Sequence, residues 1–297
     1  MQHTDAVGPI DAGGRFRRIR VMAIRVLPNQ HRTAESAANP LILGLPMTDK
    51  LYILTGASRG LGAALARQLL LPSNRLLCIS RRVDADLAAQ AGAASSPLEQ
   101  WPLDLADPLP AAARLEAWLG AQDPLRFSEA CLINNAGVVP RVGPADAAGA
   151  DELSNALRVG LEAPIVLCAA FLRATRGWPG VRKVLNVSSG LGRRAMAGSA
   201  VYCAAKAGMD HFSRAAALDE AHRGSRARIV SLAPGVIDTD MQIRLREADA
   251  TGFPEQGNFR SLKDSGGLTS PATAAQRMLA YLARADFGST VVADVRD

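Results

Sequence analysis

The chain has 297 residues, and its 34 lysines and arginines against 28 aspartates and glutamates give a formal net charge of +6 at pH 7. The length suits one large domain, and because 48% of the residues are hydrophobic but only 4% aromatic, we expect a core of Ala, Leu, Val and Ile. Half of the charge lies in residues 1–46, where six arginines face three acids, so the basic balance argues little for a nucleic-acid partner.

The segment 1–46 differs in pattern from the rest of the chain. The run Arg15-Phe16-Arg17-Arg18-Ile19-Arg20, followed by apolar residues, is compatible with an arginine-rich transit peptide or a basic membrane-contacting segment. The segment is irregular, however, and Pro28 and Pro40 interrupt it. We therefore expect a disordered extension or a misassigned upstream start, with the folded domain spanning residues 47–297.

From residue 47 onward, apolar runs alternate with helical patterns, which indicates a single α/β domain with a doubly wound parallel sheet. We see no repeat and no second domain. The expected strands lie near 51–55, 75–80, 99–103, 129–134, 182–188, 227–233 and 289–293. The expected helices lie near 60–71, 110–119, 151–174, 199–222 and 271–284.

A glycine-rich turn follows the first of these strands and leads directly into the first helix. It reads Thr55-Gly56-Ala57-Ser58-Arg59-Gly60-Leu61-Gly62. Glycines permit a tight turn and a close approach of the backbone, and the N–H groups and dipole at a helix N-terminus attract phosphate. Such turns also occur for packing alone, but the strand–turn–helix context predicts a site for the phosphates of a dinucleotide.

The end of the second strand bears on which dinucleotide is bound. An NAD enzyme typically carries an acid at this place, where it accepts the ribose hydroxyls. Here the strand ends in Ser80, Arg81 and Arg82, and Arg59 lies within the glycine turn. Because guanidinium groups bind phosphate through paired, charge-assisted hydrogen bonds, this pattern favours NADP(H). Solvated loop charges would explain one of these arginines more readily than all three.

A serine, a tyrosine and a lysine carry the pattern of a catalytic site. Ser189 ends the strand near 182–188, and Tyr202 and Lys206 are spaced to share one face of the following helix. A nearby ammonium favours the phenolate, and a serine hydroxyl can orient a carbonyl oxygen. The Tyr–Lys pair alone is more often a tyrosine packed on a lysine stem. In this order after a glycine turn, the three residues predict acid–base chemistry on a carbonyl.

At this point the chain resembles the short-chain dehydrogenase/reductase family over roughly residues 48–297. The resemblance implies a Rossmann-type sheet flanked by helices, an NADPH/NADP+ cofactor and a carbonyl substrate. It also implies that Tyr202 donates the proton while Lys206 lowers the pKa of Tyr202 and holds the ribose. Further positions that match family motifs, and so imply cofactor contacts, are Asp104 near adenine, Asn135, Ala136 and Gly137 in N-N-A-G, and Pro234, Gly235, Ile237 and Thr239 in P-G-x-x-x-T.

Within the family, the second half most resembles sepiapterin reductases and their bacterial sepiapterin/benzil reductase-like relatives. The resemblance rests on Tyr202-Cys203-Ala204-Ala205-Lys206-Ala207, on Ala233 to Gln242 and on the ending Val292 to Asp297. It implies that Asp294 anchors a pterin ring, with an exposed C-terminal carboxylate as the alternative. One departure is Gly160, which stands where the family usually carries an asparagine that holds a water beside the lysine. Asn155, five residues earlier, does not share that face.

The resemblance also implies an NADPH-dependent reductase of small dicarbonyls or pterin-like ketones, with a 3-oxoacyl-type or other short-chain reductase and a non-catalytic NADPH sensor or scaffold as alternatives. Residues 241–267 fall where the family places a substrate lid, and we expect a short helix near 239–248 there. Helices 151–174 and 199–222 resemble those that pair subunits in homodimers or homotetramers. Four scattered cysteines and four unclustered histidines indicate a cytoplasmic protein without a metal site. No apolar run approaches the roughly 20 residues of a membrane span.

Overall fold

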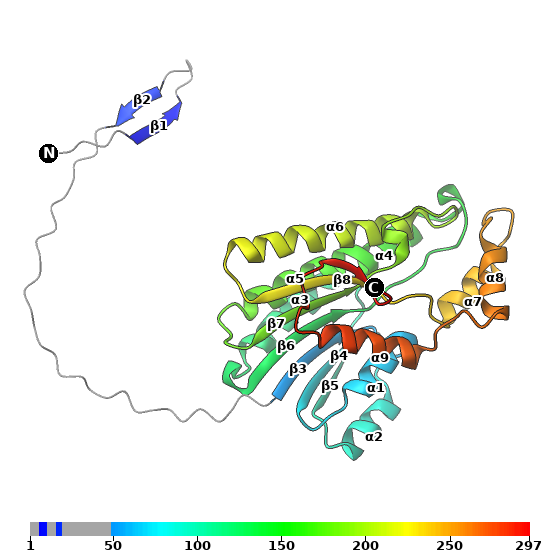
Figure 1. The fold of residues 1–297 in the computed structure, drawn as a ribbon, viewed down its shortest axis with the longest axis horizontal. Helices are drawn as coiled ribbons and strands as arrows, with labels where there is room; N and C mark the ends of the chain where they lie inside the picture. Colours follow the sequence, from blue (N-terminus) through cyan, green and yellow to red (C-terminus); the bar gives the residue numbers. More distant parts are fainter. Residues whose placement is uncertain (1–5, 11–15, 20–48) are drawn as a thin grey trace, which may run out of the picture. The chain divides into compact units, whose positions relative to one another are not determined.

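The computed structural model describes residues 6–10, 16–19 and 49–297. Residues 49–297 contain a parallel sheet of seven strands (Figure 1). Every neighbouring pair in this sheet is parallel, which confirms the predicted doubly wound architecture. Across the sheet the strands are β5 (Leu98–Pro102), β4 (Asn74–Ser80), β3 (Asp49–Thr55), β6 (Phe127–Asn134), β7 (Val181–Val187), β8 (Ala227–Ala233) and β9 (Val292–Asp294).

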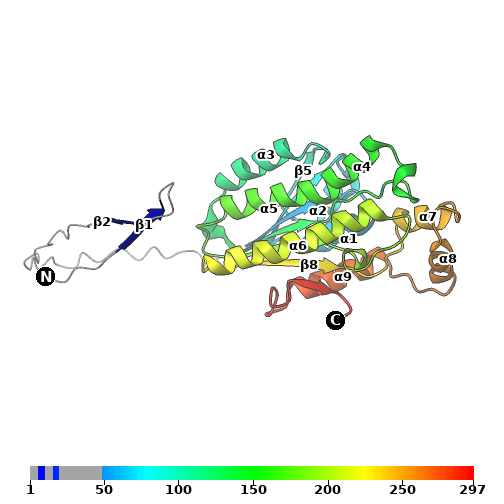
Figure 2. The same ribbon diagram turned by 90° about the horizontal axis from the view of Figure 1, so that it is seen from above.

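Helices cover both faces of the sheet because its strands are apolar on both sides. Leu51 and Ile53 of β3 pack on one face, while Leu54 packs on the other. The first face is covered by α3 (Pro108–Gly120), α5 (Ala163–Ala174) and the long α6 (Ala200–His222), which lie together in Figure 2. The second is covered by α1 (Gly60–Leu69), α2 (Ala85–Ala93) and α9 (Pro271–Leu282). Parallel strands buried on both sides are typical of this architecture.

One of these helices, α2, is absent from the sequence prediction. Its N-terminus is capped by Asp84, whose carboxylate accepts a hydrogen bond from the Leu87 N–H at 3.0 Å. Only Leu87 and Ala91 of this helix are buried, so its apolar stripe is short. A helix of nine residues with two core positions leaves little periodicity in the sequence.

The predicted helix over 151–174 is interrupted at its centre. It consists of α4 (Ala150–Leu157), a π-helical turn η3 (Arg158–Glu162) and α5. Pro164 has no N–H to donate to the carbonyl of Gly160 four residues earlier, so the regular α-helical bond is missing there. This interruption widens the helix at Gly160.

Among the described residues, one helical stretch, Ala150–Ala174, has the length and the apolar composition needed to cross a membrane. The prediction that no apolar run approaches this length was therefore wrong. Half of its most apolar window is buried inside the structure, and α5 packs against α3 and the sheet. The apolar composition therefore also matches that of a core helix.

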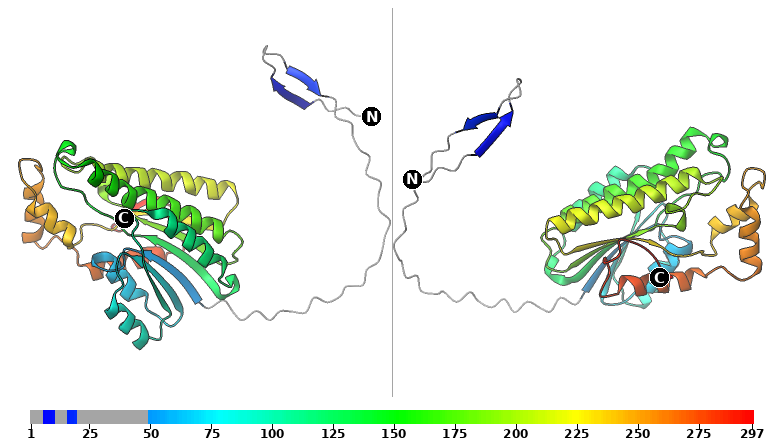
Figure 3. Two further views of the ribbon diagram at one scale, coloured as in Figure 1. Left: turned by 180° about the vertical axis from the view of Figure 1, so that it is seen from behind. Right: turned by 45° about the horizontal axis from the view of Figure 1, so that its top comes forward.

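The segment predicted as a lid contains two helices, of which only the first was predicted. They are α7 (Asp240–Glu247) and α8 (Gln256–Asp264), which stand apart from the two layers on the sheet (Figure 3). Asp238 accepts a hydrogen bond from the Lys263 ammonium at 2.6 Å and ties the end of α8 to the start of the segment. An apolar cluster of Met196, Leu245 and Phe253 fills the space beneath.

Within residues 1–46 the structure describes β1 (Ala6–Ile10) and β2 (Phe16–Ile19), which pair antiparallel. The other residues of that segment lie outside the described ranges, so the predicted disorder stays a prediction. All four cysteines are free, and Cys78, Cys131 and Cys168 are buried, which agrees with their prediction as small apolar core residues.

Candidate active site

A cavity of about 620 Å³ opens at the carboxyl ends of the parallel strands. This is where ligands bind in open α/β sheets, because the loops leaving the strands diverge there. Every predicted site residue except Arg82 lines the cavity. The fold therefore brings the predicted residues to one cavity although they span more than two hundred positions in the chain, from Gly56 to Asp294.

The glycine turn leaves no room for side chains. Gly56 has φ +72°, and a Cβ on it would lie 2.9 Å from the Cα of Ala136. A Cβ on Gly62 would lie 2.0 Å from the carbonyl oxygen of Gly56. The Asn135 amide donates hydrogen bonds to the carbonyls of Thr55 (3.0 Å) and Gly56 (3.1 Å), so the N-N-A-G segment braces the turn. The N-terminus of α1 carries no side-chain cap, which leaves its N–H groups for phosphate.

The side chains expected at the adenosine phosphate lie around the same turn. The Ser80 hydroxyl is nearly buried and accepts a hydrogen bond from the Ala57 N–H at 2.8 Å, so it fixes the turn. Arg81 is exposed and lines the cavity. Arg59 pairs with Asp240 of α7 at 3.1 Å, with both side chains more than half exposed. Arg59 and Arg81 therefore lie beside the glycine turn, and β4 contains no carboxylate.

Ser189, Tyr202 and Lys206 converge on the cavity from two elements. Ser189 follows the end of β7, and its hydroxyl accepts a hydrogen bond from the Leu191 N–H at 3.2 Å. Tyr202 and Lys206 lie one turn apart on α6, with the lysine Nζ 5.7 Å from the centre of the phenol ring. Lys206 is 6% exposed, and its ammonium donates a hydrogen bond to the carbonyl of Val187 at 2.7 Å. The predicted spacing therefore places a phenol and an ammonium beside one serine hydroxyl.

Burial dominates the protonation of both groups. It raises the pKa of Tyr202 to about 12, while the hydrogen bond with the Ser189 hydroxyl lowers this pKa. Burial also lowers the pKa of Lys206 to about 8, while the negative charge of Asp210 raises it. Lys206 was expected to lower the pKa of the phenol, whereas in this structure the lowering comes from the Ser189 hydroxyl and is outweighed by burial. At neutral pH Tyr202 therefore carries its proton and is ready to act as an acid.

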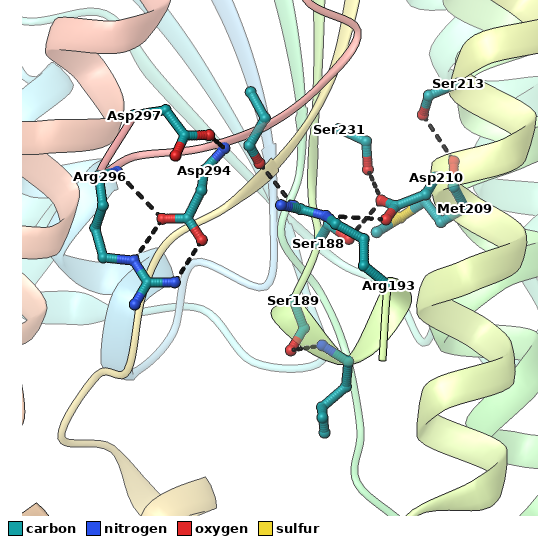
Figure 4. Close-up of polar contacts among 12 residues, drawn as sticks. Ser188, Ser189, Arg193, Met209, Asp210, Ser213, Ser231, Asp294, Arg296 and Asp297 are labelled. Atoms are coloured by element: carbon teal, nitrogen blue, oxygen red, sulfur yellow. Dashed lines mark hydrogen bonds and ion pairs between the residues drawn. The ribbon is translucent and has the colours of Figure 1, made fainter. Parts of the chain in front are cut away.

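Asp294 lies at the cavity wall but is already paired. It is 5% exposed, and its two carboxylate oxygens accept hydrogen bonds from the Arg296 guanidinium, each 2.7 Å long (Figure 4). These bonds hold the pKa of Asp294 below its usual range. The carboxylate of Asp297 in turn accepts a hydrogen bond from the Asp294 N–H at 3.1 Å. The sequence predicted a site role for Asp294 but not its pairing with Arg296, although an arginine two residues after an aspartate could have indicated such a pair.

The substrate half of the cavity is largely apolar, a property that the sequence did not reveal. Its wall includes Leu191, Met196, Leu245 and Phe259, the last two from α7 and α8. The Phe259 ring stacks on Phe253 with centroids 5.6 Å apart. The helical spacing of apolar residues in α7 and α8 is the signal that would have indicated this wall.

Gly160 and Asn155 lie on different sides of their helical stretch, as expected. Gly160 is buried in the π turn, and a Cβ on it would lie 3.3 Å from the Cβ of Ala205 on α6. Asn155 lines the cavity, whereas Gly160 does not belong to its lining. Asn155 of α4 therefore borders the cavity from the same continuous helical stretch, five residues before Gly160.

Comparisons with known proteins agree with this arrangement. The model of the family described as short chain dehydrogenase matches residues 50–250. A benzil reductase ((S)-benzoin forming) from Bacillus cereus is 34% identical over 235 residues, covering 79% of this chain and 94% of the relative. A sepiapterin reductase from Rattus norvegicus is 34% identical over 267 residues, covering 82% and 95%. The crystal structure of a metagenomic short-chain oxidoreductase in complex with NADP superposes with a TM-score of 0.62 at 25% identity, covering 84% and 96%.

Proposed function

The chain belongs to the short-chain dehydrogenase/reductase family, and on that premise we propose that it is an NADPH-dependent reductase of small dicarbonyl compounds. The observation that carries the proposal is the convergence of Ser189, Tyr202 and Lys206 on one cavity that also contains the glycine turn. Benzil reductases of similar sequence support a ketone beside a second carbonyl as the substrate, and sepiapterin reductases of similar sequence support a ketone on a pterin side chain.

In the cofactor half of the cavity, residues from four loops have cofactor-binding roles. In the proposal, the N–H groups between Gly56 and Gly62 hold the diphosphate, and Arg59 and Arg81 hold the additional phosphate of NADPH. Asp104, Ala136 and Gly137 border the adenosine, and Pro234, Gly235, Ile237 and Thr239 hold the nicotinamide end. When bound, the cofactor supplies a hydride.

The protein residues carry out the proton chemistry. The Ser189 hydroxyl donates a hydrogen bond to the substrate carbonyl oxygen and holds it beside Tyr202, because both side chains line the same wall. The Tyr202 hydroxyl then donates its proton to that oxygen as negative charge develops. The Lys206 ammonium stabilises the phenolate that remains, since the two groups lie within a turn of α6 and the ammonium is buried.

The test compares the reduction of benzil, diacetyl, sepiapterin and an acetoacetyl thioester with NADPH and with NADH. We expect benzil and diacetyl to cause rapid loss of NADPH absorbance, and NADH to be at least about tenfold less effective because the pairing of the extra phosphate with arginine is lost. Turnover of an acetoacetyl thioester alone would contradict the dicarbonyl assignment and favour a 3-oxoacyl-type reductase. Tight NADPH binding without turnover of any compound would favour a sensor or scaffold.

The pairing of Asp294 with Arg296 bears on pterin-like substrates. A ring with N–H donors needs free carboxylate oxygens, and both oxygens of Asp294 already accept hydrogen bonds from Arg296. Replacing Arg296 by alanine removes both guanidinium hydrogen bonds and leaves only the one from the backbone N–H of residue 296 to Oδ1. We therefore expect kcat/KM for sepiapterin to rise by roughly tenfold, which is about the value of one charge-assisted hydrogen bond. The benzil rate should change little. An unchanged sepiapterin rate would show that Asp294 does not bind the substrate.

A further inference from the structure

The helix that carries Tyr202 and Lys206 also carries a buried carboxylate, which the proposed reaction does not use. Asp210 of α6 is 1% exposed and lies one helical turn beyond Lys206. Its Oδ1 accepts hydrogen bonds from the hydroxyls of Ser188 and Ser231, each 2.6 Å long (Figure 4). Ser188 directly precedes Ser189, and Ser231 lies in β8. One oxygen of Asp210 thus ties the catalytic helix to the ends of two strands.

The second oxygen of Asp210 meets the turn that follows Ser189. A Cβ on Gly192 would lie 2.6 Å from Oδ2, so this turn passes against the carboxylate. The Nε of Arg193 lies 3.7 Å from the same oxygen, and Oδ2 has no hydrogen-bond partner among the described residues. Arg193 also donates a hydrogen bond to the carbonyl of Ala293 at 2.7 Å, next to Asp294. The contacts of Asp210 therefore extend from α6 through the Ser189 turn to β9.

Two hydroxyl donors do not neutralise a buried carboxylate, so its charge acts on nearby cations. Lys206 is one of them, and it has lost most of its hydration, with one hydrogen bond to the Val187 carbonyl described. Burial alone favours the neutral amine, and Asp210 opposes this by raising the pKa of Lys206. The other titratable or charged groups facing this region are Tyr202 and Cys203 on α6, Arg193 from the turn, and Asp294 beyond Arg193.

We propose that Asp210 is a positioning residue for the reaction, which fixes the turn carrying Ser189 and keeps the buried Lys206 in its ammonium form. The catalytic part of this inference rests on the proposed function. The interaction of Asp210 with Lys206 does not, because both residues are part of the unliganded fold.

The chain offers a direct measurement of this interaction, because it contains four lysines, Lys50, Lys183, Lys206 and Lys263. In protein labelled with ¹³C at the lysine ε-carbons, a pH titration followed by NMR resolves each ammonium, and the spectrum of Lys206→Met assigns the signal. The wild-type Lys206 signal is expected to titrate near the pKa of about 8. In Asp210→Asn the midpoint should fall by about one pH unit, because an adjacent opposite charge is lost.

Two controls separate charge from packing. Lys183 is buried beside Glu129 at 2.6 Å in another part of the sheet, so its signal should not respond to Asp210→Asn. Ser231→Ala removes one of the two hydrogen bonds to Oδ1 and keeps the charge. This variant should lose thermal stability and retain the wild-type Lys206 midpoint. An equal fall of the midpoint in Ser231→Ala and Asp210→Asn would overturn the proposal, since loosened packing would then explain both.

The pH dependence of turnover tests the catalytic part. With benzil and NADPH, the alkaline limb of kcat should move to lower pH in Asp210→Asn by the same interval as the NMR midpoint. An unmoved limb would contradict the positioning role. If the wild-type protein reduced no carbonyl while the Lys206 midpoint still moved, the proposed function would fail and the interaction would stand.

A second variant covers the case in which Asp210→Asn does not fold. The Arg193 side chain is 34% exposed, so Arg193→Met is expected to be tolerated. Losing this cation removes a repulsive charge and leaves more of the Asp210 charge to act on Lys206. The Lys206 midpoint should therefore rise, and a midpoint that stays in place or falls would contradict the proposal.

Discussion

Replacing Tyr202 by phenylalanine is expected to lower kcat for benzil by about a hundred- to ten-thousandfold, the usual contribution of a positioned general acid. The substitution removes one hydroxyl and keeps the ring that packs 5.7 Å from the Lys206 Nζ. The cofactor half of the cavity is built by other elements, so the Kd for NADPH should change by no more than about tenfold, the most that one lost hydrogen bond contributes to binding. Steady-state rates and quenching of protein fluorescence by NADPH measure the two effects.

The chain provides a matched control in Tyr281. Its ring packs against Phe287 with centroids 6.2 Å apart and lies under the Arg284 guanidinium at 4.9 Å, and it does not line the cavity. Tyr281→Phe removes the same hydroxyl from a site without the proposed chemistry and should leave kcat unchanged. Substantial activity in Tyr202→Phe would show that another group supplies the proton, and the Ser189–Tyr202–Lys206 assignment would then be wrong.

The architecture was predictable because its signals are local. Seven apolar runs separated by helical patterns predict a parallel sheet, and the glycine turn predicts a phosphate site wherever a strand leads into a helix. Tyr202 and Lys206 share a face because they lie four residues apart on a helix. The parallel topology then places the carboxyl ends of all strands at one edge. Local spacing and this topology were sufficient to bring nearly all of the predicted residues to one cavity.

The unpredicted features depend on contacts between distant residues or on breaks in the hydrogen-bond pattern. Asp210 gains its significance from Ser188 and Ser231, which lie more than twenty residues away, directly after β7 and within β8. The π turn at Gly160 arises because a proline four residues later lacks a donor, an effect that helical periodicity does not display. The pKa of Tyr202 depends on burial, which spacing along a helix does not report.

The second large effect is expected at the glycine turn. In Gly62→Ala the new Cβ would lie 2.0 Å from the Gly56 carbonyl oxygen and 2.5 Å from the Asn135 amide nitrogen. The first neighbour is backbone, which cannot rotate away, and the second is the side chain that braces the turn. We expect the free energy of unfolding to fall by about 3 kcal/mol or more, at the upper end of overpacking costs. Tm should fall by roughly 6 °C or more, and NADPH binding should be lost.

Gly92→Ala is the control for the change from glycine to alanine itself. Gly92 lies in α2, and nothing stands within 4 Å of where its Cβ would be. Alanine is the better helix former, so this variant should match the wild-type Tm or exceed it, by up to about 1 kcal/mol in stability. Thermal unfolding with and without NADPH compares the two variants. If Gly62→Ala kept the wild-type Tm and its stabilisation by NADPH, the turn would have space that the structure does not show, and the cradle would not be the phosphate site.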